Sequence, residues 1–268
     1  EVPTNAVKIL VAEDNYINQE YILETLKSMG YEPTLAETGE EVLELLKNHG
    51  YPAKDPNAFQ AILMDCQMPI MDGYKATQFI RLGRAGAQWK KIPIIALTAN
   101  ANPQDRLYCL ECGMTDFLNK PIDEDMLEAS IKKLIYSNSS EGQQKLPVSK
   151  SKDKPVWAYD KAMKRFRNNE VLLFKLVDQF EIDLEKLVGQ IQPSNAQVDI
   201  AMTASLSHGC KGAALNLGFE ALGEVIGDLE TYAHNTNTQA LFDSYDELLS
   251  AVEAVHQLKI EYLKNAPS

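Results

Sequence analysis

The chain has 268 residues, of which 45% are apolar and 24% charged, a composition typical of a folded globular protein of one or two domains. Its formal net charge of −12 argues against nucleic-acid binding through a basic surface. No apolar run approaches the roughly 20 residues that a membrane-spanning helix needs, and residues 1–7 lack a signal-peptide pattern. Because the first residue is Glu1 rather than Met, we expect the chain to be part of a longer protein.

Short apolar runs alternate with amphipathic helical stretches over residues 7–136. The expected strands are Val7–Ala12, Pro33–Ala36, Ala61–Met64, Ile92–Leu97 and Asp116–Leu118. The expected helices are Asn15–Met29, Glu40–Lys47, Gly73–Arg84, Asn102–Cys112 and Asp123–Tyr136. Short apolar strands that end in polar residues are typical of a buried parallel sheet, so the alternation predicts a doubly wound α/β domain. The stretch HGYPAKDP at 49–56 is expected to be a surface insertion.

Residues 137–155 are rich in Ser, Lys, Gln and Pro and predict a flexible linker between a first domain, 1–136, and a second domain, 156–268. Strand signals disappear after this linker. Apolar residues recur at steps of three and four from Leu173 to Ile191, which predicts an amphipathic helix. Further helices are expected at 196–216, 219–234 and 238–263. The second domain is therefore predicted to be an all-α four-helix bundle.

Both parts of the chain are acidic. Residues 1–136 contain 20 acidic and 13 basic residues, and residues 157–268 contain 16 and 9, so each part has a net charge of −7.

Polar side chains that could take part in catalysis or metal binding follow four of the five predicted strands. They are Glu13 and Asp14 after the first strand, Asp65 after the third, Thr98 after the fourth and Lys120 after the fifth. A five-stranded parallel sheet in the order 2-1-3-4-5 would bring these side chains together beyond its carboxyl edge, where ligands bind in this fold class.

Three carboxylates at one place repel each other unless a cation lies among them, and a hard divalent ion such as Mg²⁺ prefers oxygen ligands. We therefore expect Glu13, Asp14 and Asp65 to hold Mg²⁺, with Asp65 also acting as the nucleophile toward a phosphoryl group. Lys120 would pair with that group as an exposed pocket lysine with little packing role, and Thr98 would donate its hydroxyl.

Four sequence blocks carry a resemblance to a known family. The blocks ILVAEDNYINQ, ILMDCQMPIMDGY, IIALTAN and DFLNKPI resemble, in order and spacing, the motifs of bacterial-type receiver domains, especially those within hybrid sensor histidine kinases. The resemblance covers residues 7–136. It implies that the metal also takes the backbone carbonyl of Gln67, and that Thr98 and Phe117 form a switch pair that responds to phosphorylation.

His208 lies on a predicted helix with unusual neighbours. At about 100° per residue, Met202, Leu206, Cys210, Ala213 and Leu217 form one stripe, which we expect to be buried. His208 lies about 200° from Leu206, so its ring is expected to point to solvent.

The residues on the same face as His208 suggest a docking surface for a second protein. Lys211 and Gly212 follow at i+3 and i+4, and small or apolar residues continue the face at Ala201, Ala204 and Leu215. Lys211 would steady a phosphoryl group on the ring, and Gly212 would leave room for the partner.

The run HGCKGAALNLG from His208 to Gly218 resembles the H-x-x-K-G-x-x-x-x-x-G signature of histidine phosphotransfer domains. This resemblance covers residues 157–265, with a short lead-in helix expected at Tyr159–Phe166. It implies that His208 exchanges phosphoryl groups with aspartates of receiver domains, so the implied partners are histidine kinases and other receivers.

Four cysteines in a chain of this length favour a reducing, cytoplasmic location. Cys109 and Cys112 form a C-x-x-C pair, which supplies only two of the four ligands of a structural zinc site. A redox pair remains an alternative, but packing near a helix end is the preferred interpretation.

These patterns together predict a phosphorelay chain, most simply the C-terminal part of a hybrid sensor histidine kinase. No P-loop or ATP-binding kinase pattern occurs, so enzymatic activity of the chain alone stays open. A free-standing receiver–phosphotransfer protein is one alternative. A phosphohydrolase with Asp65 as nucleophile is another, although Gln67 stands where that chemistry needs a second acid. A vestigial interaction module is the third.

Overall fold

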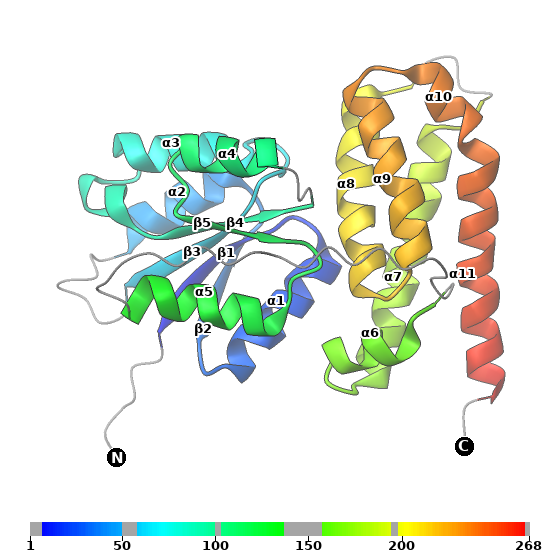
Figure 1. Ribbon diagram of the computed structural model, residues 1–268, viewed down its shortest axis with the longest axis horizontal. Coiled ribbons are helices and arrows are strands. Elements are labelled where there is room, and N and C mark those ends of the chain that lie inside the picture. Colours follow the sequence, from blue (N-terminus) through cyan, green and yellow to red (C-terminus); the bar gives the residue numbers. More distant parts are fainter. Residues whose placement is uncertain (1–6, 50–57, 100–102, 137–156, 194–197, 266–268) are drawn as a thin grey trace. The chain divides into compact units, whose positions relative to one another are not determined.

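The computed structural model describes residues 7–49, 58–99, 103–136, 157–193 and 198–265. The chain divides into two compact units, Glu1–Val148 and Ser149–Ser268, and each is considered by itself. The first unit contains a five-stranded sheet, and the described part of the second contains helices only (Figure 1). The predicted fold class is therefore confirmed. The linker predicted at 137–155 lies outside the described residues, as does the insertion at 49–56 apart from His49.

The strands form one parallel sheet in the predicted order, β2-β1-β3-β4-β5. They are β1 (Lys8–Ala12), β2 (Glu32–Ala36), β3 (Phe59–Asp65), β4 (Ile94–Thr98) and β5 (Asp116–Asn119). The inner strands are almost wholly buried because helices cover both faces of the sheet. At one edge lies β2, whose Pro33 pairs in register with Ile9, and at the other lies β5, which has only 4 residues.

Helices cover both faces of the sheet (Figure 1). One face carries α1 (Tyr16–Ser28) and α5 (Glu124–Tyr136), and the other carries α2 (Gly39–Asn48), α3 (Gly73–Leu82) and α4 (Pro103–Glu111). A 3-10 helix that the sequence did not predict, η1 (Ala87–Lys91), places Trp89 in the core. The indole N–H of this fully buried residue donates to the Leu46 carbonyl at 2.7 Å.

The second unit begins with the short helix α6 (Tyr159–Arg165), at the predicted lead-in position. Four long helices follow: α7 (Glu170–Gln190), α8 (Ile200–Asn216), α9 (Glu220–His234) and α11 (Tyr245–Asn265). Each packs against two of the others, because α7 contacts α8, α8 contacts α9, α9 contacts α11 and α11 contacts α7. This closed arrangement encloses the apolar side chains of the unit.

Two details of the predicted helices are wrong. The helix expected at 238–263 breaks at Ser244 into α10 (Thr238–Asp243) and α11, and the Ser244 hydroxyl donates to the Ala240 carbonyl at 2.8 Å, a contact that often bends helices. The predicted buried stripe of α8 also differs, since Met202 is 48% exposed and Leu206 is half-buried. Both α7 and α9 pack against α8, so its buried face is broader than one stripe and includes Thr203 and Ala214.

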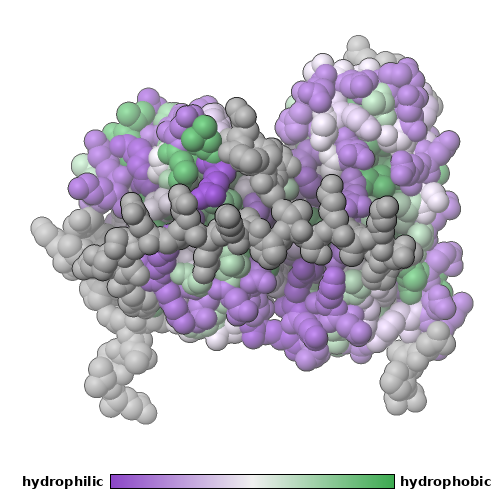
Figure 2. Space-filling view, viewed as in Figure 1, coloured by the Kyte–Doolittle hydropathy of each residue, from purple (hydrophilic) through white to green (hydrophobic). Residues whose placement is uncertain are grey.

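The face drawn in Figure 2 is mainly hydrophilic, with small separate hydrophobic patches. Among the described residues, large apolar side chains that remain exposed include Ile70, Leu82, Leu107, Val171 and Met202. No helix in the described ranges combines the length and the apolar character needed to cross a membrane.

Among the described glycines of the first unit, Gly73 has the least room for a side chain, so Gly73→Ala should destabilise this unit. A Cβ there would lie 2.0 Å from the Asp65 carbonyl oxygen and 2.8 Å from Met64 Cγ. Overpacking of this kind costs about 1–3 kcal/mol. Urea unfolding in a Trp157→Phe background measures this cost, because Trp89 is then the only tryptophan and reports the first unit. Gly189→Ala has open space within α7, so it should leave the Trp89 transition unchanged; an unshifted Gly73→Ala transition would contradict the steric argument.

Candidate functional site

The carboxyl edge of the sheet gathers three acidic side chains. Glu13 and Asp14 follow β1, and Asp65 ends β3, the strand beside β1. One carboxylate oxygen from each lies within 4.8 Å of the others. Glu13 and Asp65 are fully buried, while Asp14 is half-buried. The structure therefore brings together the three predicted acidic residues.

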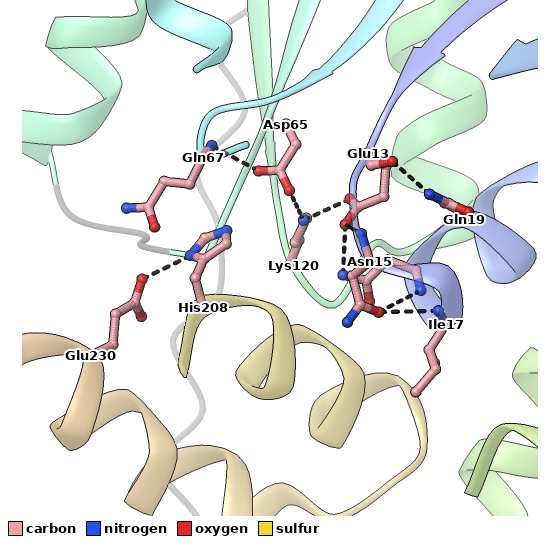
Figure 3. A network of polar contacts seen from close by, with 10 residues as sticks. Glu13, Asn15, Ile17, Gln19, Asp65, Gln67, Lys120, His208 and Glu230 are labelled. Carbon is pink, nitrogen blue, oxygen red and sulfur yellow. Dashed lines mark hydrogen bonds and ion pairs between the residues drawn. The ribbon is translucent and has the colours of Figure 1, made fainter. Parts of the chain in front are cut away.

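Lys120 lies between two of these acids. Its Nζ is 2.6 Å from Asp65 Oδ2 and 2.7 Å from Glu13 Oε2, contacts drawn in Figure 3. The expectation that Lys120 is an exposed residue is wrong, because only 6% of it is exposed. The buried acids need a counter-charge, so the lysine has a structural role in addition to any chemical one.

The pKa values show which charges are compensated. The pKa of Glu13 is raised to about 7, chiefly by burial and also by the neighbouring Asp65 and Asp14 charges, against the opposing effect of Lys120. Burial acts against the charge on Lys120, but the charges of Asp65 and Glu13 outweigh burial and raise the pKa of the ammonium above its usual value. One ammonium thus faces three carboxylates.

A hard divalent cation fits this arrangement. The three carboxylates and Lys120 leave a formal charge of −2 when all are ionised, and the donors are oxygen atoms, which Mg²⁺ prefers. The backbone of Gln67 lies beside the Asp65 carboxylate, because the Gln67 N–H donates to Asp65 Oδ1 at 3.1 Å. The carbonyl ligand assigned to Gln67 stays a prediction.

The first turn of α1 holds Glu13 in place, a support that the sequence did not reveal. Asn18 Nδ2 donates to Glu13 Oε1 at 2.9 Å, and Gln19 Nε2 donates to the Glu13 carbonyl at 2.8 Å. Asn15 caps the helix by accepting from the N–H groups of Ile17 and Asn18 (Figure 3). The residue types of Asn18 and Gln19 offered part of this information, because side-chain amides that are buried on a helix need hydrogen-bond partners nearby.

Thr98 and Phe117 lie on adjacent strands. Thr98 ends β4, is 5% exposed and pairs in register with Asn119, while Lys120 N–H donates to its carbonyl at 2.7 Å. Phe117 is two residues before Asn119 and so faces the same side of the sheet as Thr98. Its half-buried ring lies under the Arg106 guanidinium, 4.6 Å from the ring centroid. Their predicted switching role remains a prediction.

The cysteines pack in ways that the C-x-x-C spacing did not predict. All four are free and buried, and the thiol close to Cys109 is Cys66, with 3.9 Å between the sulfur atoms. Within the described ranges, the one cluster of three candidate metal-binding side chains is the acidic one, which contains no cysteine.

In the second unit, His208 is held by a carboxylate from another helix. Its Nδ1 lies 2.7 Å from Oε1 of Glu230 on α9 (Figure 3). Lys211 Nζ lies 3.1 Å from Oε2 of the same residue. The prediction that the ring points to solvent is wrong, since His208 is 5% exposed. Glu230, which is 3% exposed, is the residue that sequence reasoning missed.

The face predicted for docking is also partly covered by α9. A Cβ on Gly223 would lie 2.9 Å from Leu215, and one on Gly227 would lie 3.3 Å from Lys211, so both side chains rest against α9. Gly212 is buried and Ala204 is half-buried, whereas Ala201 is exposed. Leu215 is therefore an intramolecular packing residue rather than part of an open face.

Glu230 stays ionised in this setting. Burial acts to raise its pKa, but the hydrogen bond with His208 and the charges of His208 and Lys211 together lower the pKa below its usual value. A carboxylate that contacts both the imidazole and the ammonium orients the ring and fixes the lysine beside it.

Comparison with known proteins identifies the first unit. Residues 9–132 match the family of response regulator receiver domains. Hybrid signal transduction histidine kinase B of Dictyostelium discoideum is 41% identical over 135 residues, covering 47% of this chain and 6% of the kinase. Kinase K of the same organism is 36% identical over 137 residues, covering 50% of this chain and 11% of the kinase.

One similar solved structure is the receiver domain of a sensor histidine kinase from Pseudomonas aeruginosa, crystallised with a magnesium ion in its active-site cleft. The two sequences are 39% identical, and the match covers 49% of this chain and 99% of the Pseudomonas chain, with a TM-score of 0.43. The N-terminal half of the chain is thus a two-component receiver domain, homologous to those of hybrid histidine kinases. The chain spans only 6% of the length of kinase B and 11% of the length of kinase K.

Lys120→Ala should destabilise the receiver domain, and Mg²⁺ should restore part of the loss. Removing one partner of a buried ion pair costs about 3–5 kcal/mol, because the remaining carboxylates lose their counter-charge. A divalent ion would replace that charge, so Mg²⁺ should stabilise the variant more than the parent. Trp89-reported urea unfolding with EDTA or with Mg²⁺ measures both effects. Adding Asp65→Asn should reduce the Mg²⁺ effect, and equal Mg²⁺ effects in all chains would contradict this site.

Glu230→Gln should flatten the acid dependence of stability in the second unit. Because the folded pKa of Glu230 lies below 4.5, the unfolded chain binds more protons in acid. The stabilisation is complete above pH 4.5 and is lost as the pH falls through the folded pKa. Unfolding followed by Trp157 fluorescence, in a Trp89→Phe background, should show this loss in the parent but much less in Glu230→Gln. Asp228→Asn, which removes an exposed carboxylate of α9, should keep the parental slope.

Proposed function

We propose that this chain is a phosphorelay module in which Asp65 accepts a phosphoryl group from a phosphohistidine and His208 exchanges phosphoryl groups with receiver aspartates. The observation that carries the first half is the buried Asp65 carboxylate, which Lys120 contacts at 2.6 Å beside two further acids. In this proposal, residues 1–136 form the receiver, 137–155 the linker and 156–268 a histidine phosphotransfer four-helix bundle.

At the receiver, an Asp65 carboxylate oxygen attacks phosphorus, a P–O bond forms and the P–N bond of the donor breaks, with the electron pair leaving on the imidazole nitrogen. Gln67 N–H holds Oδ1, and Lys120 lies close enough to Oδ2 to pair with the incoming phosphoryl oxygens. Glu13, Asp14, Asp65 and the Gln67 carbonyl would hold Mg²⁺, which would neutralise phosphoryl charge.

Thr98 and Phe117 would report the phosphorylated state. Thr98 ends the strand next to Asp65, and its hydroxyl would donate to a phosphoryl oxygen. Since Phe117 faces the same side of the sheet from the adjacent strand, movement of Thr98 would free space for its ring. Arg106 stacks on that ring and would carry the change to α4.

In the second unit, the contact between Nδ1 and Glu230 assigns the chemistry to the other ring nitrogen. With Nδ1–H donating to Glu230, the nucleophilic electron pair of the imidazole is on Nε2, which would take the phosphoryl group. Lys211, at 3.1 Å from Glu230, would then pair with the phosphoryl oxygens. This arrangement, in a closed set of four long helices, supports the phosphotransfer proposal.

The parent protein is proposed to be a hybrid histidine kinase, with a histidine kinase and other receivers as partners. A cytoplasmic setting suits the four free thiols. A free-standing receiver–phosphotransfer protein differs only in what surrounds this chain. A phosphohydrolase is disfavoured, because Gln67 provides a backbone N–H to Asp65 where that mechanism needs a second acid.

Acetyl phosphate with Mg²⁺ should phosphorylate the chain once on Asp65, to give an acyl phosphate that is lost in base. Phosphoramidate should phosphorylate His208, to give a phosphohistidine that is stable in base and lost in acid. Intact-mass spectrometry before and after each treatment distinguishes the two products. Asp65→Asn should remove the base-labile species alone and His208→Gln the acid-labile one alone. A phosphoryl group that survives both substitutions would show that the acceptors are wrongly assigned.

A further inference from the structure

The C-x-x-C sequence of Cys109 and Cys112 has no part in the function proposed above, and its two thiols have different neighbours. Cys112 Sγ accepts from Gln78 Nε2 at 3.7 Å, whereas Cys109 Sγ lies 3.9 Å from Cys66 Sγ. None of these cysteines is in a disulfide. The thiol in contact with Cys109 therefore belongs to a residue 43 positions away in the sequence.

Cys66 follows Asp65 directly, and its backbone is fixed on both sides. Its N–H donates to the Leu97 carbonyl at 3.1 Å, and its carbonyl accepts from the Gly73 N–H at 3.2 Å. Cys109 belongs to α4, which follows β4 along the chain. The sulfur contact thus joins α4 to the residue next to the phosphoacceptor.

The two sulfur atoms need only a small movement to form a bond. A disulfide bond is about 2.05 Å long, so sulfur atoms 3.9 Å apart have to approach by about 2 Å. Because the Cys66 backbone is held by two strands and the start of α3, most of this movement falls on Cys109 and the helix that carries it.

Both thiols are buried, with exposed fractions of 2% for Cys66 and 0% for Cys109. The Tyr74 hydroxyl lies 4.0 Å from Cys109 Sγ, and the Tyr74 side chain is itself only half-buried. The thiol pair is therefore one side chain away from the surface. Buried thiols react slowly, because the reactive form is the thiolate and burial disfavours charge. We expect this pair to respond to an excess of oxidant rather than to traces.

Helix α4 also contacts the proposed switch residue Phe117. The Arg106 guanidinium of α4 lies 4.6 Å from the Phe117 ring centroid. The same ring packs against the core cluster that contains Cys66 and Cys109. A bond between the two thiols would hold α4 at the end of β3, and it would oppose the movement of Phe117 that the proposed function links to phosphorylation.

We propose that Cys66 and Cys109 are a redox pair, which a peroxide converts to a disulfide that holds α4 at the end of β3 and lowers the phosphorylation of Asp65. One thiolate attacks a peroxide oxygen, the O–O bond breaks and a sulfenic acid forms. The second thiol attacks that sulfur, so an S–S bond forms, the S–O bond breaks and water leaves. The two thiols give up two electrons and two protons in total, and the peroxide becomes two molecules of water. A thiol reductant reverses the bond by exchange.

Peptide mapping by mass spectrometry tests the bond without any phosphorylation. The reduced chain is treated with excess hydrogen peroxide and then with catalase, and its remaining thiols are alkylated in denaturant. The expected product has lost two hydrogen atoms and yields a peptide that links Cys66 to Cys109 until dithiothreitol is added. Cys112→Ala is the matched control and should keep this link, whereas Cys109→Ala should lose it. A link between Cys109 and Cys112, or oxidation without any link, would overturn the redox pair.

Acetyl phosphate with Mg²⁺ tests the effect on Asp65, which rests on the phosphorelay function. The linked chain should reach a steady-state phosphorylation about fivefold lower than the reduced chain, and dithiothreitol should restore it. Cys109→Ala treated with the same oxidant should keep the level of its reduced form. A linked chain that is phosphorylated as well as the reduced chain would overturn the role of α4. If the reduced chain takes up no phosphoryl group, the phosphorelay function fails and the effect on Asp65 fails with it, while the peptide map still decides the bond.

Discussion

The ion pair of Lys120 with Asp65 and Glu13 is the contact on which the receiver domain depends. Two fully buried carboxylates cannot remain ionised without a cation, and the sheet supplies one from its far strand. Because the strands are parallel, the ends of β1, β3 and β5 lie at the same edge of the sheet, and the order β2-β1-β3-β4-β5 makes β1 and β3 neighbours. The topology, the amide support from α1 and the tight packing at Gly73 all serve to hold this group of charges together.

The two candidate sites have opposite charge arrangements. In the receiver, carboxylates outnumber the single ammonium, so an incoming phosphoryl group needs a further cation. In the helical unit, one carboxylate, Glu230, is shared by an imidazole and an ammonium. In the proposed function, Lys211 would pair with a phosphoryl group on His208, whereas the receiver site, with its excess of carboxylates, would call on Mg²⁺.

Sequence patterns predicted the parts of the structure that depend on local order. The positions of three site residues follow from the strand ends, because Asp65 ends its strand and Glu13 and Lys120 come directly after theirs. Glu230 was missed because it reaches His208 from 22 residues away, across a helix contact that periodicity does not specify. Helical geometry predicts that His208 lies about 200° from Leu206 around the helix, but direction alone does not tell which neighbouring elements cover a side chain. The break at Ser244 was missed for a similar reason, since the apolar repeat continues through it.

The edges of the sheet determine how the receiver behaves when many copies are close together. An exposed strand edge can pair with another chain and start aggregation. On β2, Pro33 has no N–H to offer, and Glu32 forms an ion pair with Lys8 of the adjacent strand at 3.3 Å. At the other edge, β5 is only 4 residues long, too short to template a long intermolecular ladder. In the proposed relay, receivers that meet their partners repeatedly can thus collide without their sheets pairing edge to edge.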